Sequence, residues 1–133
     1  PNEMEYSKMC FPSPVLPQFP TDPRDQVATV TLSSLTDALI VRVRDPHDIP
    51  PNWELYPILG PDPDEPEWHG EDEPAGVWDE TTDEMVELTG IELQIPKTDL
   101  EPYLGTQVAL RYKFRDESSL ELSSDVLLMR IEP

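Results

Sequence analysis

Residues 106–115 carry the pattern that most restricts the fold, because apolar and mostly polar side chains alternate along them. Val108, Leu110, Tyr112 and Phe114 occupy every second position. Successive side chains of a β-strand point to opposite faces, so this segment would have one apolar and one wetter face. In a helix, Val108 and Leu110 would lie about 200° apart and could not share a face. The segment therefore predicts an antiparallel strand with one solvated face.

Shorter segments elsewhere have strand-like composition, and turn residues separate them. These segments are 27–32, 39–43, 53–59, 84–88, 91–95 and 126–131. In the last of them, the alternation places Leu127, Met129 and Ile131 inward. About seven short strands predict an all-β fold, an antiparallel β-sandwich over residues 26–133.

Residues 98–105 are the one place where a helical turn is expected. Thr98 is a capping residue and Gly105 a typical stop, while Pro102 limits the helix to a turn or two. This turn would bridge the strand that ends at Ile95 and the strand that begins at Thr106. In a sandwich, that connection crosses from one sheet to the other.

The C-terminal third of the chain resembles bacterial immunoglobulin-like repeat modules of large surface or secreted proteins. The resemblance is best over residues 91–131, looser over 14–44, and does not cover 45–90. It implies an Ig-like sandwich with a spacer or adhesion role, and it transfers no catalytic or binding residue. The residues that carry it are Ile95-Pro96, Leu100, Tyr103-Leu104-Gly105-Thr106, Val108, Leu110, Tyr112, Ser123-Ser124 and Leu127-Leu128-Met129-Arg130-Ile131.

Charge and proline divide the remainder of the chain. Residues 61–87 hold twelve of the 28 acidic residues and no Lys or Arg, so they carry most of the net charge of −19. Six prolines lie in residues 1–23 and eight in 46–74, and both regions are expected to be extended or turn structure. We expect residues 1–25 to be a Pro-rich N-terminal arm or linker, or an edge strand, and 61–87 to be an ordered or half-ordered acidic insertion.

The acidic balance and the cysteine count exclude several classes of function. A surface this acidic repels nucleic-acid phosphates and anionic membranes, whereas it attracts basic proteins or divalent cations. Cys10 is the only cysteine, which excludes an internal disulfide and a Cys-rich zinc site. Because the chain begins at Pro1 rather than Met, we expect it to be a processed or excised fragment.

The three tryptophans, Trp53, Trp68 and Trp78, fall close together in sequence, and two roles are open to them. They form an aromatic platform for a sugar or peptide, or they fill the core and anchor the insertion. The acids at 62–65 and 71–73 could donate oxygen ligands to Ca²⁺, but their spacing does not match an EF-hand. We therefore predict no cofactor.

Acidic segments that contain tryptophan combine electrostatic steering with an anchor, which favours a partner protein that has a basic surface. The candidate partner-binding residues are Trp68, Trp78, Asp62, Asp64, Glu65, Glu67, Glu71, Asp72 and Glu73. No phosphate loop, HExxH or Gly-x-Ser-x-Gly motif occurs, so we expect no catalytic residues and no enzyme.

These observations predict a non-enzymatic spacer, adhesion or protein-binding module of a larger bacterial protein. An alternative is an acidic inhibitor or immunity-type protein that occupies a basic partner surface. A third is a carbohydrate-binding module that uses the tryptophans. A repeat module would lie at the cell surface or be secreted, whereas an inhibitor would be cytoplasmic.

Overall fold

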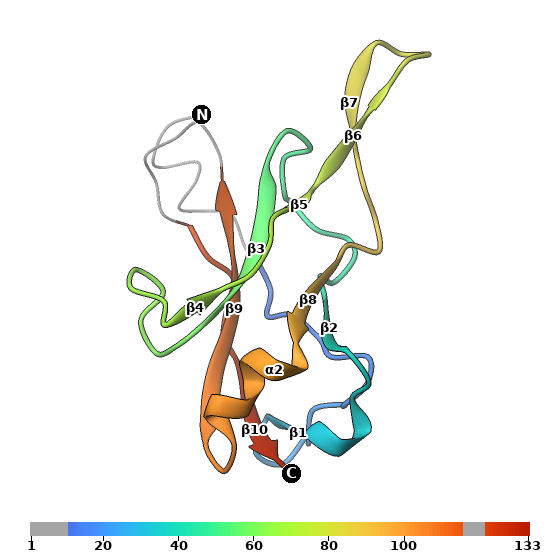
Figure 1. The fold of residues 1–133 in the computed structure, drawn as a ribbon. Helices are drawn as coiled ribbons and strands as arrows, with labels where there is room; N and C mark the ends of the chain where they lie inside the picture. The colour runs from blue at the N-terminus through green and yellow to red at the C-terminus, as the bar shows by residue number, and fades with distance from the viewer. Residues whose placement is uncertain (1–10, 116–121) are drawn as a thin grey trace.

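The computed structural model describes residues 11–115 and 122–133, and strands dominate them (Figure 1). The predicted all-β class is confirmed. The helical elements are short: η1 (Leu32–Ser34), α2 (Lys97–Leu100) and η2 (Glu101–Tyr103). Within the described residues, no helix has the length and apolar character needed to cross a membrane. Residues 1–10 of the predicted arm, Cys10 among them, lie outside the described residues.

The larger sheet is built around β9 (Gln107–Arg115), the segment with the clearest alternation in the sequence. Its strand order is β1–β10–β9–β3–β4, and β5 also pairs with β3. The other strands are β1 (Val27–Thr31), β3 (Glu54–Leu59), β4 (Trp68–His69), β5 (Glu73–Pro74) and β10 (Leu127–Glu132). β9 is paired along both edges, and its inward residues Val108, Leu110 and Tyr112 are buried as predicted.

One pair in this sheet is parallel, which corrects the prediction of a wholly antiparallel sandwich. β1 and β10 run in the same direction, from Val27↔Leu128 to Thr31↔Glu132. Tight hairpins impose antiparallel pairing on strands that follow each other, but β1 and β10 come from opposite ends of the domain. Their relative direction depends on long connections, which local residue patterns do not record.

The smaller sheet pairs β2 (Ala38–Arg42) with β8 (Glu92–Pro96) in antiparallel register. Both sheets contribute to one core. Its fully buried side chains include Leu39, Val41, Leu93 and Ile95 from the smaller sheet and Leu55, Leu110, Tyr112, Met129 and Ile131 from the larger one. Each such side chain contributes about 1.5–3 kcal/mol through burial, so this core supplies most of the driving force for folding.

The connection from β8 to β9 consists of α2 and η2, and it crosses between the sheets as predicted. Leu100 at the end of α2 is fully buried in the core. Gly105 has a φ of +79°, which glycine adopts without strain, and its N–H donates to the Ile131 carbonyl at 2.8 Å. The turn therefore delivers the chain into the register that β9 needs.

From Phe11 onward, the segment predicted as a linker or edge strand lies against the core. Phe11 and Leu16 are buried, and the Tyr112 hydroxyl donates to the Pro12 carbonyl at 2.9 Å. Val15 exchanges two backbone hydrogen bonds with Arg42, both 2.9 Å, at the outer edge of β2. Residues 11–16 thus cover one edge of the smaller sheet.

The acidic insertion divides into two parts. Residues 61–74 contain β4 and β5 and stay on the larger sheet, whereas β6 (Gly76–Asp79) and β7 (Glu84–Glu87) form a separate two-stranded hairpin. This hairpin projects away from the two sheets (Figure 1). The segment predicted at 84–88 corresponds to β7, while β4, β5 and β6 had no strand prediction. We call residues 76–87 the hairpin and the other described residues the body.

Candidate partner-binding surface

The hairpin is a regular structure with a tightly bonded turn. β6 and β7 pair from Gly76↔Glu87 to Asp79↔Glu84. The Asp79 carboxylate accepts hydrogen bonds from the Thr81 backbone N–H at 2.9 Å and from its hydroxyl at 2.6 Å. The Thr81 hydrogen bonds hold the pKa of the Asp79 carboxyl below its ordinary value. The turn therefore has a defined shape although it lies far from the core.

The hairpin leaves large apolar side chains in solvent. Val77 is 49% exposed, Trp78 52% and Met85 37%, which makes three of the five large exposed hydrophobic residues within 11–115 and 122–133. Trp78 lies directly opposite Met85 on one face, and Val77 lies opposite Val86 on the other. Paired residues of a hairpin share a face, so each face has its own apolar pair. Exposed apolar side chains gathered on one element are common at interaction sites, which makes the hairpin the candidate surface.

Acidic residues surround these apolar pairs. Five of the twelve hairpin residues are acidic, none is Lys or Arg, and the five are Asp79, Glu80, Asp83, Glu84 and Glu87. All except Asp79 are exposed. Acidic surfaces generally favour association with positively charged proteins, and indole and thioether groups suit close contact.

The base of the hairpin is fixed to the body. Ala75 is fully buried, its N–H donates to the Trp53 carbonyl at 3.0 Å, and its carbonyl accepts from Leu88 at 2.9 Å. The buried His47 ring donates through Nε2 to the Leu88 carbonyl at 2.7 Å, and its Nδ1 lies 3.1 Å from the Glu87 carboxylate. The hairpin is thus anchored at one end and free at the other.

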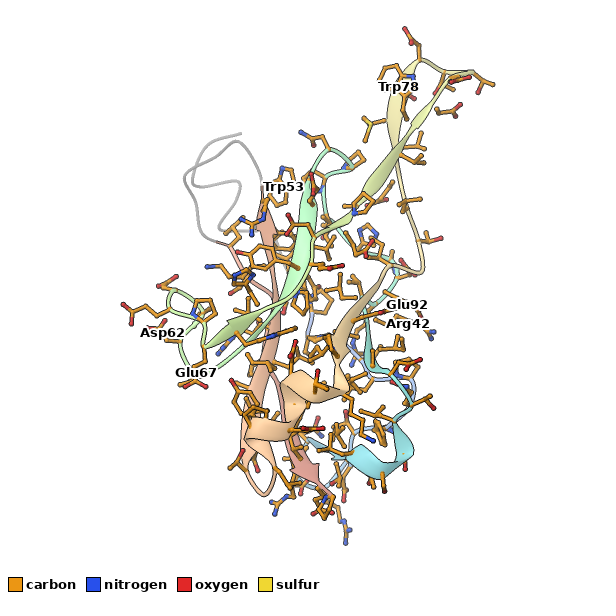
Figure 2. The ribbon with its side chains drawn as sticks, in the orientation of Figure 1. Arg42, Trp53, Asp62, Glu67, Trp78 and Glu92 are labelled. Atoms are coloured by element: carbon orange, nitrogen blue, oxygen red, sulfur yellow. The ribbon has the colours of Figure 1, made fainter. Side chains whose placement is uncertain are left out.

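Four predicted site residues, Asp62, Asp64, Glu65 and Glu67, lie on the β3–β4 connection. Asp62 accepts backbone hydrogen bonds from Asp64 at 2.9 Å and from Glu65 at 3.1 Å, which close a local turn. Figure 2 shows Asp62 and Glu67 on one side of the body and Trp78 on the projecting hairpin. The predicted acidic surface is therefore not continuous.

This connection is held by the outer face of β9 and by η2. The Lys113 ammonium donates to the Pro63 carbonyl at 2.8 Å, which explains why Lys113 is buried although its position predicts a solvated face. The Tyr103 hydroxyl donates to the Glu67 carboxylate at 3.2 Å. Burial, together with that hydrogen bond, raises the pKa of Tyr103.

Asp72 is already paired within the chain. The Arg115 guanidinium donates to both Asp72 carboxylate oxygens at 2.8 and 2.9 Å, and it lies 4.5 Å from the ring centre of Tyr56. The hydrogen bond to Asp72 raises the pKa of Arg115. A residue in such a pair has its charge partly neutralised, so Asp72 contributes less to an external surface than the hairpin acids do.

The predicted residues Trp68, Glu71 and Glu73 gather elsewhere, around a cavity of about 460 Å³ between β4–β5 and β8. Trp68 is half-buried, and its indole N–H donates to the Asp99 carboxylate at 3.1 Å. Trp68 therefore belongs to a different site from Trp78.

Trp53 is buried, with only 4% of its surface exposed. Its ring packs 5.3 Å from that of Phe114 and 6.3 Å from that of Phe11, measured between ring centres. A sugar cannot stack on a ring that the core encloses, so the predicted platform of Trp53, Trp68 and Trp78 does not exist as one surface. Trp53 fills the core instead, which was the alternative role for it.

Sequence reasoning identified Trp78 but did not include Val77, Met85 and Val86 among the site residues. Their signal is visible in retrospect, since two short apolar pairs flank a polar stretch of hairpin-turn length at 79–84. Within residues 11–115 and 122–133, no three His, Cys, Asp or Glu side chains are grouped as metal ligands would be.

Comparison with known proteins adds nothing to this picture. No family model, no curated protein and no solved structure matches the chain. Its function has to be inferred from its own geometry.

Proposed function

We propose that this chain is a non-enzymatic protein-binding module with an immunoglobulin-like fold, part of a larger bacterial protein, and that the hairpin is its contact with a basic partner surface. The observation that carries the proposal is the set of exposed apolar side chains, Val77, Trp78 and Met85, on a projecting element that holds five acidic residues and no Lys or Arg. The body then acts as the scaffold that presents it.

The strand order supports the immunoglobulin-like part of the proposal. Neighbouring strands β10, β9 and β3 stand in the order of the G, F and C strands of that fold, and β2 with β8 stand as B with E. Trp53 directly precedes β3 and is buried, which resembles the buried tryptophan of strand C. The chain departs from antibody domains because its single cysteine, Cys10, allows no bridge between the sheets.

Energetics support binding over a purely passive spacer. The apolar pairs of the hairpin gain little from folding, because an isolated two-stranded hairpin is marginal and these side chains remain in water. A partner that buries Trp78 and Met85 would gain about 25 cal/mol for each Å² of apolar surface removed from water. Indole side chains are also enriched among residues that dominate binding energy.

The acidic inhibitor remains the second candidate, and the charge of the hairpin is the observation that favours it. An inhibitor would insert the hairpin into a basic active site, whereas an adhesion module would bind a partner without affecting its activity. The activity of a captured partner, assayed with and without the chain, separates the two.

The test compares Trp78→Ser with Leu104→Ser as bait in the same cell extract. Leu104 is 48% exposed, a fraction similar to the 52% of Trp78, but it lies on the body. The control therefore removes a similarly exposed apolar group away from the hairpin. We expect the wild type and Leu104→Ser baits to retain basic proteins that the Trp78→Ser bait does not retain. Added salt should release these proteins. Retention of the same proteins by all three baits would refute the hairpin as the contact.

A further inference from the structure

The two outer edges of the smaller sheet differ in how their backbone groups are satisfied. On β2, the backbone N–H and C=O groups of Arg42 form two hydrogen bonds with those of Val15, both at 2.9 Å. The Ile40 N–H donates to the Gln18 side-chain oxygen at 2.7 Å. The Gln18 amide in turn donates to the Ala38 carbonyl at 3.4 Å. This edge is therefore covered by the chain itself.

In the described residues, the outer edge of β8 has no hydrogen-bonded strand beside it. The Val43 N–H donates to the Ile91 carbonyl at 3.0 Å. This hydrogen bond fixes the residues of β8 whose backbone groups point toward β2. Because peptide groups alternate between the two edges of a strand, the N–H and C=O groups of Glu92 and Gln94 point away from β2. Within residues 11–115 and 122–133, no hydrogen bond joins those groups to another residue. An uncovered edge of this kind is a template for another strand.

A cavity of about 460 Å³ opens beside this edge, which is within the usual range for ligand sites. Gln94 and Pro96 of β8 form one wall, and residues 68–71 with Glu73 form much of the other. The space thus lies between the free edge of one sheet and the irregular edge of the other.

The lining of the cavity is acidic and aromatic. Glu71, Glu73 and Asp99 provide three carboxylates, the Trp68 ring provides an apolar wall, and no Lys or Arg is among the lining residues. The nearby Lys97 ammonium donates to the Leu35 carbonyl at 3.2 Å. Carboxylates beside an indole suit a lysine or arginine side chain, which gains both ion pairing and a cation–π contact.

We propose that an extended basic segment of a partner protein adds as a strand to the outer edge of β8, with its cationic side chains in this acidic cavity. Main-chain hydrogen bonds to Glu92 and Gln94 supply affinity, and the carboxylates with Trp68 supply selectivity for Lys or Arg. The inference rests on a different part of the molecule from the hairpin, so either site can fail without the other.

The test uses a short synthetic peptide of alternating lysine and valine and follows Trp fluorescence and the backbone NMR signals of Glu92 and Gln94. We expect saturable binding that shifts both amide signals. N-methylation of alternate peptide amides should weaken binding by about tenfold or more, because it removes main-chain hydrogen bonds without changing the protein. Equal affinity of the two peptides, or no binding, would overturn the proposal.

Matched variants locate the site. The double substitution Glu71→Gln and Glu73→Gln should weaken peptide binding by about tenfold at low salt. The same change at Glu80 and Glu84 of the hairpin should leave affinity unchanged. Gln94→Ala should also bind normally, because the proposed contact is with the backbone. Loss of binding only in the hairpin variant, or a dimer of this chain formed through β8, would contradict the assignment.

Discussion

The body and the hairpin treat their apolar residues in opposite ways. In the body, Leu110 and Tyr112 are fully buried on one face of β9, and strands pair with both of its edges. In the hairpin, Trp78 and Val77 lie on opposite faces, and each remains about half exposed in the described chain. Folding explains the first arrangement. The second gains little from folding, which is why we assign it to recognition.

The two regions also differ in how their acids are used. On the body, Asp72 between β4 and β5 is paired with Arg115, and Glu67 before β4 accepts a hydrogen bond from the Tyr103 hydroxyl. On the hairpin, Glu80 and Glu84 have no basic neighbour within the described residues. The negative charge of the insertion is thus partly neutralised on the body, whereas Glu80 and Glu84 near the hairpin turn display theirs to solvent.

The largest effect expected separates the regions by stability. Leu110→Ala should lower the free energy of unfolding by about 2–5 kcal/mol, because it leaves a cavity in the core. Met85→Ala on the hairpin should change it by no more than about 0.5 kcal/mol, as exposed substitutions usually do. Urea denaturation measures both. Comparable losses in the two variants would mean that the hairpin belongs to the folding core.

A second change tests where the hairpin ends and the body begins. Gly76 lies against Pro51 so closely that an added Cβ would collide with the Pro51 backbone carbonyl. Gly76→Ala should therefore cost about 1–3 kcal/mol, the range for overpacking. Glu80→Ala, at an exposed position of the turn, serves as the control, with little expected change. If Gly76→Ala left the free energy of unfolding unchanged, Gly76 would belong to the hairpin, and the boundary between hairpin and body would lie closer to the core.

The contact between β9 and the β3–β4 connection should contribute less. Lys113→Met keeps an apolar stem but loses the hydrogen bond to the Pro63 carbonyl, for a cost of about 1 kcal/mol. Backbone amides of residues 60–67 should exchange with solvent faster, whereas hairpin amides should not change. Arg130→Met, at an exposed position of β10, is the matched control. Unaltered exchange at 60–67 would show that Lys113 does not hold the connection.

The smallest effect concerns pH and the hairpin turn. Since the Thr81 hydrogen bonds lower the pKa of Asp79 from 3.8, its contribution to turn stability is present above that value and is lost as pH falls through the folded-state pKa. The Thr81 amide NMR signal should shift with a midpoint below 3.8. Asp79→Asn should abolish this transition. A midpoint at or above 3.8 would contradict the turn geometry.

Much of the body could be predicted because its strands carry local alternation. The inward residues of β9 and β10 and the crossing at residues 97–103 follow from side-chain period and turn chemistry. The parallel β1–β10 pair could not be predicted, because no local pattern records the direction of strands far apart in the sequence.

The candidate site was harder to predict than the body. Trp68 and Trp78 were grouped because they are close in sequence, but β5 separates a half-buried position on β4 from an exposed one on β6. β4 and β5 are only two residues long, too short for a period to appear. Burial of Lys113 depends on a distant carbonyl, so its strand position predicted a solvated face instead.

The most direct test of recognition by the hairpin is photo-crosslinking from single positions. A photoreactive aromatic amino acid at position 78 and the same group at position 104 present similar exposure on the hairpin and the body. We predict that position 78 crosslinks to a basic partner and that added salt suppresses the product, while position 104 yields none. A partner crosslinked from position 104 but not from position 78 would contradict the assignment of recognition to the hairpin.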